Sequence, residues 1–410
     1  MEMPKPYCLG IDLNDQYAVV SYFREGMKEP DTISTVAGGD AYRIPTTVAK
    51  RIGAPQWYYG DDARKMAKVC EIVYVDQLLR RAVDGDTITI EGESFEAERL
   101  LLLYLQKSIL IPQKLGGSGH MGMLVITVEK LTRAHIELFR RIAEELQLDE
   151  SRFMMMDHKQ VFYYFALSQP KELWLHDVYL FEYEKERMHY YALRRNESTK
   201  PQVITIEESD VSTLPTDRDQ GFLAMLMNVF ANKIISTVYL VGEGFEGDWL
   251  HESVNYLCRT RRAFIGRNLF SKGACYAAWQ MRRNEDWEYV YLSENDMKFN
   301  LSLKVLRAGE PVFYNLVSAG RNWFEAGGVC EVILNGETGI SFWKQLPYSS
   351  AAEIETLELS DIPQRPARAT RLRIKAEPVA NDRIQITIED LGFGEFFRSS
   401  NKTWTYTMVM

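Results

Sequence analysis

The stretch Tyr7–Phe23, YCLGIDLNDQYAVVSYF, decides the fold of the first part of the chain. Its two apolar runs, 7–13 and 17–23, have the length of strands, and a short polar turn separates them. Such a pattern predicts a β-hairpin. The turn consists of Asn14, Asp15 and Gln16, so it contains a carboxylate and no glycine. The question is what a hairpin with this charged turn can do beyond building the fold.

The composition narrows the class of protein. A chain of 410 residues with 46% hydrophobic residues predicts about two or three domains with real cores. A net charge of −9 argues against binding to nucleic acid or to an anionic membrane surface, because both need clustered Lys and Arg. Five widely spaced cysteines without a CxxC pair support neither a zinc site nor a disulfide framework. No apolar run approaches the roughly 18 residues of a membrane span. We therefore expect a soluble cytoplasmic protein without a signal segment.

Strand and helix patterns alternate twice along the first part of the chain. After the hairpin, a Leu-rich helix over 96–110 precedes a buried strand at 123–127 and an amphipathic helix at 131–148. The second series begins with paired strands at 177–183 and 188–193. A helix at 219–235, a strand at 237–241 and a last helix at 270–281 complete it. The doubling predicts two sheets that each begin with a hairpin.

The composition changes after about Asn284. Strand-length segments then recur with turn residues between them and without a long helical pattern, at 289–292, 299–305, 330–334, 340–344, 353–359, 371–375 and 383–388. This regular spacing predicts an antiparallel β-sandwich over 284–410.

In this order, the pieces resemble the actin/hexokinase/heat-shock ATPase superfamily, and the DnaK-type heat-shock chaperones most of all. The resemblance covers nearly the whole chain. It is carried by Leu9-Gly-Ile-Asp-Leu13, Arg43-Ile-Pro-Thr46, Gly60-Asp-Asp-Ala63, Val125-Ile-Thr-Val128, Val238-Tyr-Leu-Val-Gly-Glu-Gly244 and Gly273-Ala-Cys-Tyr-Ala-Ala278. It implies an α/β actin-like fold, that is, a duplicated ribonuclease H-like ATPase fold. The β-rich tail stands where these chaperones have their substrate-binding domain. We suspect a bacterial family of unknown function whose phosphate loops are degenerate.

The phosphate loops depart from the family pattern. The first turn of the family is Gly-Thr-Thr, whose backbone comes close to the phosphates, and only glycine allows that approach without a Cβ clash. Here Asn14, Asp15 and Gln16 stand in its place, and we expect the carboxylate of Asp15 to repel a polyphosphate. The second family hairpin, Asp-Leu-Gly-Gly-Gly-Thr, corresponds to Glu182-Tyr-Glu-Lys-Glu-Arg187, without glycine and with further carboxylates. Both changes indicate lost phosphate binding.

Three more family features are missing. The chaperones insert a subdomain that clamps the base, whereas the segment between Tyr183 and Val238 is too short for one. Their apolar interdomain linker is replaced by the mainly charged Arg282-Arg-Asn-Glu-Asp-Trp-Glu288. No lysine stands at Asp76–Arg80, where the resemblance puts the phosphate-binding lysine. Coupling between a nucleotide and the β-rich tail is therefore in doubt.

These observations lead to one expected organisation. Residues 1–283 form the actin-like part, with lobe I at about 1–175 and a reduced lobe II at about 176–283. Residues 284–410 form the β-sandwich. The expected function is that of a chaperone-like pseudo-ATPase, leaning away from an enzyme, that binds or scaffolds a protein or peptide partner through the sandwich. We expect no cofactor, no metal, no nucleic acid and no membrane span.

Two alternatives stay open. The first is a divergent but active ATPase that uses ATP and magnesium. In that case Asp12 orders the magnesium waters and Asp157 orients the attacking water. The remnant nucleotide cleft then comprises Asn14, Asp15, Gln16, Gly242, Gly244 and Gly273. The second alternative is an actin-like assembly protein.

Two local patterns allow other interpretations, namely a dinucleotide site and a metal site. Gly242-Glu-Gly-Phe-Glu-Gly247 matches GxGxxG after a strand, but the acidic loop and the sequence that follows favour an ordinary turn over a dinucleotide site. A metal site could be drawn from His176, Asp177 and His189 with Glu182 and Glu184. Their spacing is not that of a metal site, so structural polar contacts are the better interpretation.

Overall fold

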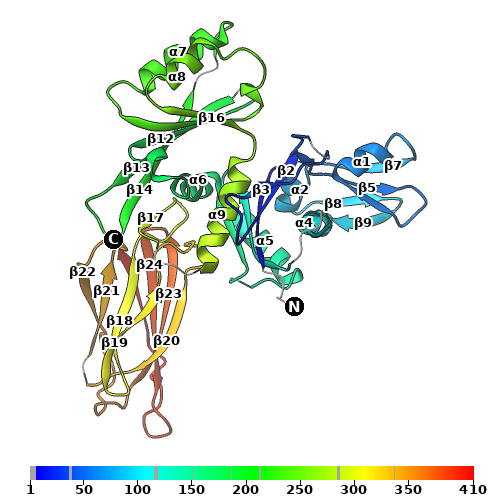
Figure 1. Cartoon of the computed structure of the whole chain (residues 1–410). Coiled ribbons are helices and arrows are strands. Elements are labelled where there is room, and N and C mark those ends of the chain that lie inside the picture. The colour runs from blue at the N-terminus through cyan, green and yellow to red at the C-terminus, as the bar shows by residue number, and fades with distance from the viewer. Residues whose placement is uncertain are drawn as a thin grey trace. The chain divides into compact units, whose positions relative to one another are not determined.

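The computed structural model describes residues 6–36, 39–114, 119–149, 151–185, 187–211, 214–283, 287–336 and 338–410. It contains two compact units (Figure 1). The first, which we call the α/β unit, comprises 1–194 and 206–286, and the second, the β unit, comprises 195–205 and 287–410. Mixed sheets with helices build the α/β unit, and from about residue 300 the β unit is entirely antiparallel. Within the expected linker 282–288, residues 284–286 lie outside the described residues.

The first sheet of the α/β unit has the strand order β11-β10-β1-β2-β3, and β4 also pairs with β2. Its hairpin is antiparallel, whereas β10 runs parallel to both β1 and β11. The strands are β1 (Tyr7–Leu13), β2 (Tyr17–Arg24), β3 (Asp31–Thr32), β4 (Ile44–Pro45), β10 (Met121–Val128) and β11 (Phe153–Asp157). The hairpin predicted from Tyr7–Phe23 is confirmed.

The second sheet repeats this order as β16-β15-β12-β13-β14. Again the first two strands form an antiparallel hairpin and the next two run parallel to its first strand. The strands are β12 (Asp177–Glu184), β13 (Arg187–Asn196), β14 (Gln202–Val211), β15 (Ile235–Val241) and β16 (Arg262–Gly266). The start of β14 pairs with β17 (Tyr289–Tyr291) inside the β unit.

Each of the helices α6 and α9 follows one sheet in the chain and packs against the other sheet. Helix α6 (His158–Leu167) follows the first sheet, yet its Phe162 packs against Tyr191 and Tyr239 of the second. Helix α9 (Leu269–Arg283) follows the second sheet, yet Ser271 bonds to Ser21 of the first at 2.7 Å. The two helices cross at Gly273, so the sheets are tied together through their own continuations.

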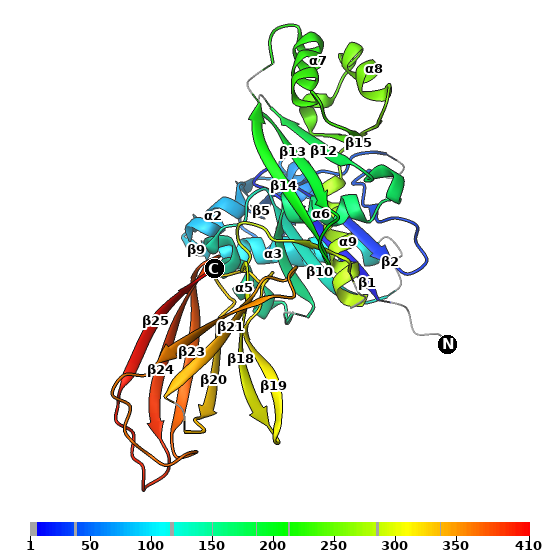
Figure 2. The same cartoon turned by 90° about the vertical axis from the view of Figure 1, so that its left-hand side faces the viewer.

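Helices α7 (Arg218–Val229) and α8 (Glu252–Cys258) pack on the second sheet. In the second sheet, Phe222 and Leu226 of α7 and Leu257 of α8 form one core with Phe181 and Leu240. Figure 2 shows the ribbons of these two helices beside the sheet. Besides α6 and α9, the helices are α1 (Gly60–Met66), α2 (Leu78–Asp84), α3 (Ala97–Ile109), α4 (Ile111–Lys114), α5 (Arg133–Glu145), α7 (Arg218–Val229) and α8 (Glu252–Cys258), with the 3-10 turns η1 (Lys171–Leu173) and η2 (Glu243–Phe245).

Two small sheets extend the first half of the α/β unit. They contain β5 (Val48–Arg51), β6 (Trp57–Tyr59) and β7 (Ile72–Val75), and separately β8 (Thr87–Ile90) and β9 (Glu93–Glu96).

From about residue 300, the β unit consists of two four-stranded antiparallel sheets with a common core. The strands are β18 (Asn300–Arg307), β19 (Glu310–Val317), β20 (Gly328–Ile333), β21 (Gly339–Gln345), β22 (Ala352–Glu358), β23 (Arg371–Ala380), β24 (Arg383–Gly392) and β25 (Thr403–Val409). The orders are β19-β18-β21-β22 and β20-β23-β24-β25. Strands β19 and β25 were not predicted from the sequence.

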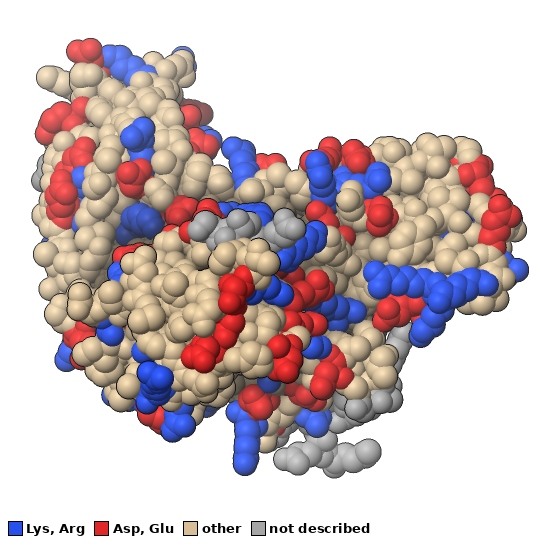
Figure 3. All heavy atoms as spheres, turned by 90° about the horizontal axis from the view of Figure 1, so that it is seen from above, with Lys and Arg blue, Asp and Glu red and all other residues tan. Residues whose placement is uncertain are grey.

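The surface carries both signs of charge side by side. On the face drawn in Figure 3, Lys and Arg alternate with Asp and Glu without a broad basic patch. Among the described helices, none is long and apolar enough to cross a bilayer.

Candidate functional site

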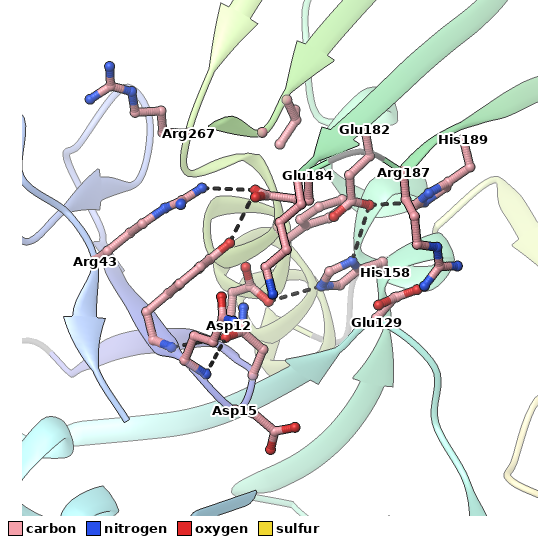
Figure 4. A pocket seen from close by; sticks show the side chains of 17 residues that line it. Asp12, Asp15, Arg43, Glu129, His158, Glu182, Glu184, Arg187, His189 and Arg267 are labelled. Atoms are coloured by element: carbon pink, nitrogen blue, oxygen red, sulfur yellow. Dashed lines mark hydrogen bonds and ion pairs between the residues drawn. The ribbon is translucent and has the colours of Figure 1, made fainter. Parts of the chain in front are cut away.

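A cavity of about 330 Å³ lies in the α/β unit where strands of both sheets end (Figure 4). In open α/β sheets, ligands bind at the carboxyl ends of strands, so this is the first place to look for a site. The described residues that line it are Asp12, Asn14, Asp15, Gln16, Tyr17, Arg43, Glu129, His158, Glu182, Glu184, Lys185, Arg187, His189, Val241, Gly242, Arg267 and Phe270.

The first turn binds its own amides. The side-chain oxygen of Asn14 accepts hydrogen bonds from the backbone N–H groups of Gln16 and Tyr17, both at 2.9 Å. Asparagine favours such turns because its short side chain reaches the backbone two or three residues ahead. Both amides are therefore already paired, and an incoming phosphate would have to displace the Asn14 side chain to reach them.

Asp15 has a structural partner as well. Its carboxylate accepts a hydrogen bond of 2.8 Å from the backbone N–H of Arg80, in the first turn of α2. A carboxylate is favourable there because the first amides of a helix have no partner within the helix. The charge that the sequence analysis treated only as repulsive to phosphate thus also holds the turn onto α2.

Deeper in the cavity, a buried histidine lies between two buried carboxylates. His158, the first residue of α6, places Nε2 at 2.9 Å from Asp12 Oδ1 of the first sheet. Its Nδ1 lies 3.7 Å from Glu182 Oε2 of the second sheet. Glu182 Oε2 in turn lies 3.1 Å from Nε2 of His189, and the ring of His158 stacks on Phe270. The acids of the two sheets therefore share an imidazole.

The charges of Asp12, His158 and Glu182 depend on one another. Burial alone would lower the pKa of His158, but the carboxylates of Asp12 and Glu182 outweigh it and raise that pKa to about 10. Burial would raise the pKa of Glu182, yet the nearby imidazoles of His158 and His189 lower it below the ordinary value. At neutral pH we expect an imidazolium between two carboxylates, so its positive charge offsets one of the two negative charges and repels a cation at this point.

Asp157 lies next to His158 but caps helix α6. Its side chain accepts a 2.8 Å hydrogen bond from the backbone of Gln160, whose side chain bonds back to the Asp157 amide at 3.0 Å. This reciprocal pair is a capping box at the start of α6. Among the described residues that line the cavity, His158 is present and Asp157 is not.

The three candidate glycines are placed by packing. A Cβ on Gly273 would lie 2.3 Å from the carbonyl oxygen of Val161, at the crossing of α6 and α9. A Cβ on Gly244 would lie 2.3 Å from the ring of Tyr183. Gly242 has a φ of 110°, a left-handed value that favours glycine, and it alone of the three lines the cavity.

The structure brings together some of the residues from which a metal site could be drawn in the sequence. Glu182, Glu184 and His189 line the cavity, whereas Asp177 pairs with Arg194 at 3.2 Å. Within the described residues, no group of three or more His, Cys, Asp or Glu side chains is arranged to hold a metal ion.

The places of His158, Tyr17 and Arg43 in the cavity were not predicted from the sequence. A histidine beside the capping Asp157 and an arginine in Arg43-Ile-Pro-Thr46 were visible, but no spacing rule assigns them to a cleft.

All five cysteines are free, and Cys8 and Cys275 are the buried ones.

Two family models match the chain. One, described as Family of unknown function (DUF5716) C-terminal, matches residues 29–294. The other, described as Domain of unknown function (DUF8552), matches residues 296–410. No curated protein matches the sequence.

Proposed function

This chain belongs to the Family of unknown function (DUF5716) C-terminal, and we propose that it is a heat-shock-like pseudo-ATPase that binds or scaffolds other proteins. The actin-like assignment is supported by the repeated order of the two sheets, β11-β10-β1-β2-β3 and β16-β15-β12-β13-β14. It is also supported by the helices α6 and α9, which cross between the sheets. A reduced second lobe fits the short path from β13 to β15, in which the described residues form only β14 and α7.

The pseudo-ATPase proposal is supported above all by the first turn, whose backbone amides are already hydrogen-bonded. A phosphate cradle needs backbone N–H groups that are free to donate. Here the Asn14 side chain occupies the amides of Gln16 and Tyr17, and Asp15 is tied to Arg80. The residues present therefore do not fit ATP.

Magnesium fits no better. Of the acids that could order its waters, Asp12 faces His158 at 2.9 Å. An imidazolium at that distance repels a divalent cation. We derive no catalytic step through either group.

A thermal-shift titration with ATP, ADP and magnesium tests this proposal, with calorimetry as the second readout. A ligand at 100 times its Kd stabilises a fold by about 2.7 kcal/mol. We expect no shift at millimolar nucleotide, with magnesium alone as the control. A clear shift would instead support the divergent ATPase, which the position of Asp12 in the cavity favours.

The protein-binding part of the proposal is supported by the β unit. Phe313 and Ile354, which are 61% and 56% exposed, lie on the same face of the sheet β19-β18-β21-β22 as Trp343. The rings of Phe313 and Trp343 are 5.6 Å apart. Exposed aromatic groups of this kind are common at protein contacts.

Fluorescence anisotropy with a labelled, permanently unfolded polypeptide tests this part. We expect binding that weakens when Phe313 is replaced by serine. Val329→Ser is the matched control, because Val329 is 52% exposed on the other sheet of the same unit. Equal binding by both variants would count against this surface. Light scattering that rises with protein concentration would favour an actin-like assembly protein instead.

A further inference from the structure

A second cavity, of about 610 Å³, lies in the α/β unit, and among the described residues it shares none with the cavity around His158. It forms where the end of β2, the turn after it and the end of α9 come together. Its volume is in the range of ligand sites, which is about 300–1,000 Å³. Three arginines, Arg24, Arg282 and Arg283, line it together with one acid, Glu25.

The charge of this wall is opposite to that of the whole chain. Three guanidinium groups and one carboxylate give a local charge of three minus one, or +2, whereas the chain carries −9. Arg282 and Arg283 are in the last turn of α9, where cations complement the helix dipole. Arg24 ends β2, so no helix end accounts for its charge there. Charges of one sign that gather at a concave surface attract a ligand of the opposite sign.

Arg282 is held at the cavity by uncharged neighbours. Its Nη1 donates to the carbonyl oxygen of Pro6 at 3.4 Å. A Cβ at Gly122, in β10, would lie 3.0 Å from its Nε, so this glycine leaves room for the guanidinium. Burial raises the pKa of the nearby Cys8 thiol to about 11, although Arg282 lowers it, so the thiol is uncharged at neutral pH. These neighbours position the guanidinium without neutralising it.

The apolar part of the wall is aromatic. The rings of Phe23 and Trp279 lie 5.0 Å apart in an edge-to-face arrangement, and Phe23 is buried. Trp279 is partly exposed, and the guanidinium of Arg283 lies 5.5 Å from the centre of its ring. Met27, which is also partly exposed, lines the same cavity, and a thioether packs well against aromatic rings. A flat apolar group can therefore pack here beside the arginines.

We propose that this cavity binds a short segment of a partner protein in which an acidic residue stands next to an aromatic residue. The carboxylate pairs with the guanidinium groups of Arg24 and Arg282, since arginine and a carboxylate form strong charge-assisted hydrogen bonds. The aromatic ring packs against Trp279 and Met27. A polyphosphate fits less well, because Glu25 in the same wall repels each of its charges.

This inference goes beyond the proposed function, because it assigns a second binding site. The protein contact proposed above lies on the sheet β19-β18-β21-β22 of the β unit, whereas this cavity belongs to the α/β unit. Either site can exist without the other, so substitutions in one unit separate their effects.

Isothermal titration calorimetry of the full chain with the peptide acetyl-Ser-Glu-Phe-Ser-amide tests the proposal. We expect binding with a Kd of about 1 mM or lower. A peptide with Gln in place of Glu, and another with Ala in place of Phe, should each bind about 10-fold more weakly or not at all. Each of them lacks one of the two groups that the cavity recognises.

Variants of the wall identify the site. In Arg24→Glu and in Arg282→Glu we expect binding that is weaker by about 10-fold or more, because the reversed charge repels the carboxylate. Arg80→Glu is the matched control and should bind as the wild type does, since the Arg80 side chain is 68% exposed and pairs with Asp84 in the same helix. Phe313→Ser should also bind this peptide as the wild type does, which tells a failure of the β-unit contact apart from a failure of this site.

Two further measurements keep the test decisive if a charge-reversal variant does not fold. Arg282→Gln removes the charge without reversing it, and wild type in 1 M NaCl needs no substitution, since salt at that concentration screens charges beyond about 3 Å. Both should weaken binding of the Glu peptide and have little effect on the Gln peptide. No binding to the wild type at millimolar peptide, or equal binding of the Glu and Gln peptides, would overturn the proposal. Displacement of the peptide by millimolar ATP would overturn it too, because the cavity would then take a phosphate ligand.

Discussion

Buried carboxylates occur in both units, and their partners differ. In the β unit, the fully buried side chain of Asp390 receives two hydrogen bonds of 2.7 Å from Arg365 and further bonds from Ser400. In the cleft, Asp12 and Glu182 share His158. Arginine keeps its charge at every accessible pH, whereas histidine can lose its proton. The Arg365–Asp390 pair is therefore insensitive to alkaline pH, whereas the contacts of His158 respond to it. A buried acid is no sign of catalysis by itself.

The largest effect is expected at Asp390. Asp390→Ala leaves Arg365 buried without its carboxylate, and breaking a buried pair in this way costs about 3–5 kcal/mol. Calorimetric unfolding of the full chain measures it, with the transition of the β unit moving to lower temperature. Glu377→Ala is the control, because its pair with Lys375 is half-exposed and worth about 0–1 kcal/mol. Equal losses in both variants would contradict the difference.

Alkaline pH should separate the two regions next. The pKa of His158 is raised above its unfolded value, so its contribution is complete below about pH 6.5 and is lost as the pH rises toward 10. The pKa of Asp390 is lowered: burial would raise it, but the bonds from Arg365 and Ser400 outweigh burial. Its contribution is present above its ordinary pKa and is lost only in acid.

Between pH 7 and 8, below the ordinary pKa of the buried thiols, we therefore expect the α/β unit to lose at most about 1.4 kcal/mol through His158 while the β unit stays constant. Hydrogen exchange at several pH values, corrected for the intrinsic rate, follows each unit separately. His158→Gln should remove this pH dependence. A dependence that survives in the variant would assign it to another group.

A smaller effect is expected at the helix crossing. Gly273→Ala brings a Cβ to 2.3 Å from the Val161 carbonyl, and overpacking of this kind costs about 1–3 kcal/mol. Urea denaturation measures the loss, which should be the same with and without ATP. Gly266→Ala is the control, since nothing lies within 4 Å of its Cβ position and its backbone is unstrained. A loss seen only with ATP would return Gly273 to a nucleotide site.

The smallest effect is expected at the first turn. Asn14→Ala removes two hydrogen bonds that are partly exposed, so we expect a loss of about 1 kcal/mol. Asn14→Asp keeps an acceptor at the same place and should be nearly neutral. Thermal unfolding of the two variants under identical conditions measures the difference. If both are neutral, the turn does not depend on the Asn14 side chain.

Much of the architecture was predictable, and its boundaries were less so. The helix expected at 219–235 ends at Val229, because Asn232 takes a left-handed backbone and Ile235 begins β15. Strand β19 was missed because six of its residues, from Glu310 on, are exposed, so it shows no alternation of buried and exposed residues. Strong apolar periodicity is readable from a chain, whereas an exposed edge strand leaves a weak signal.

By itself, the sequence determined the doubled hairpin-led pattern, the β-rich tail and the absence of glycine from the first turn, because these are local properties of residue type and spacing. Only the tertiary structure decided that His158 rather than Asp157 faces the cavity, and that Arg43 meets Glu184, 141 positions later. Such contacts arise where the strand ends of two sheets converge, and no local pattern encodes which side chains meet there.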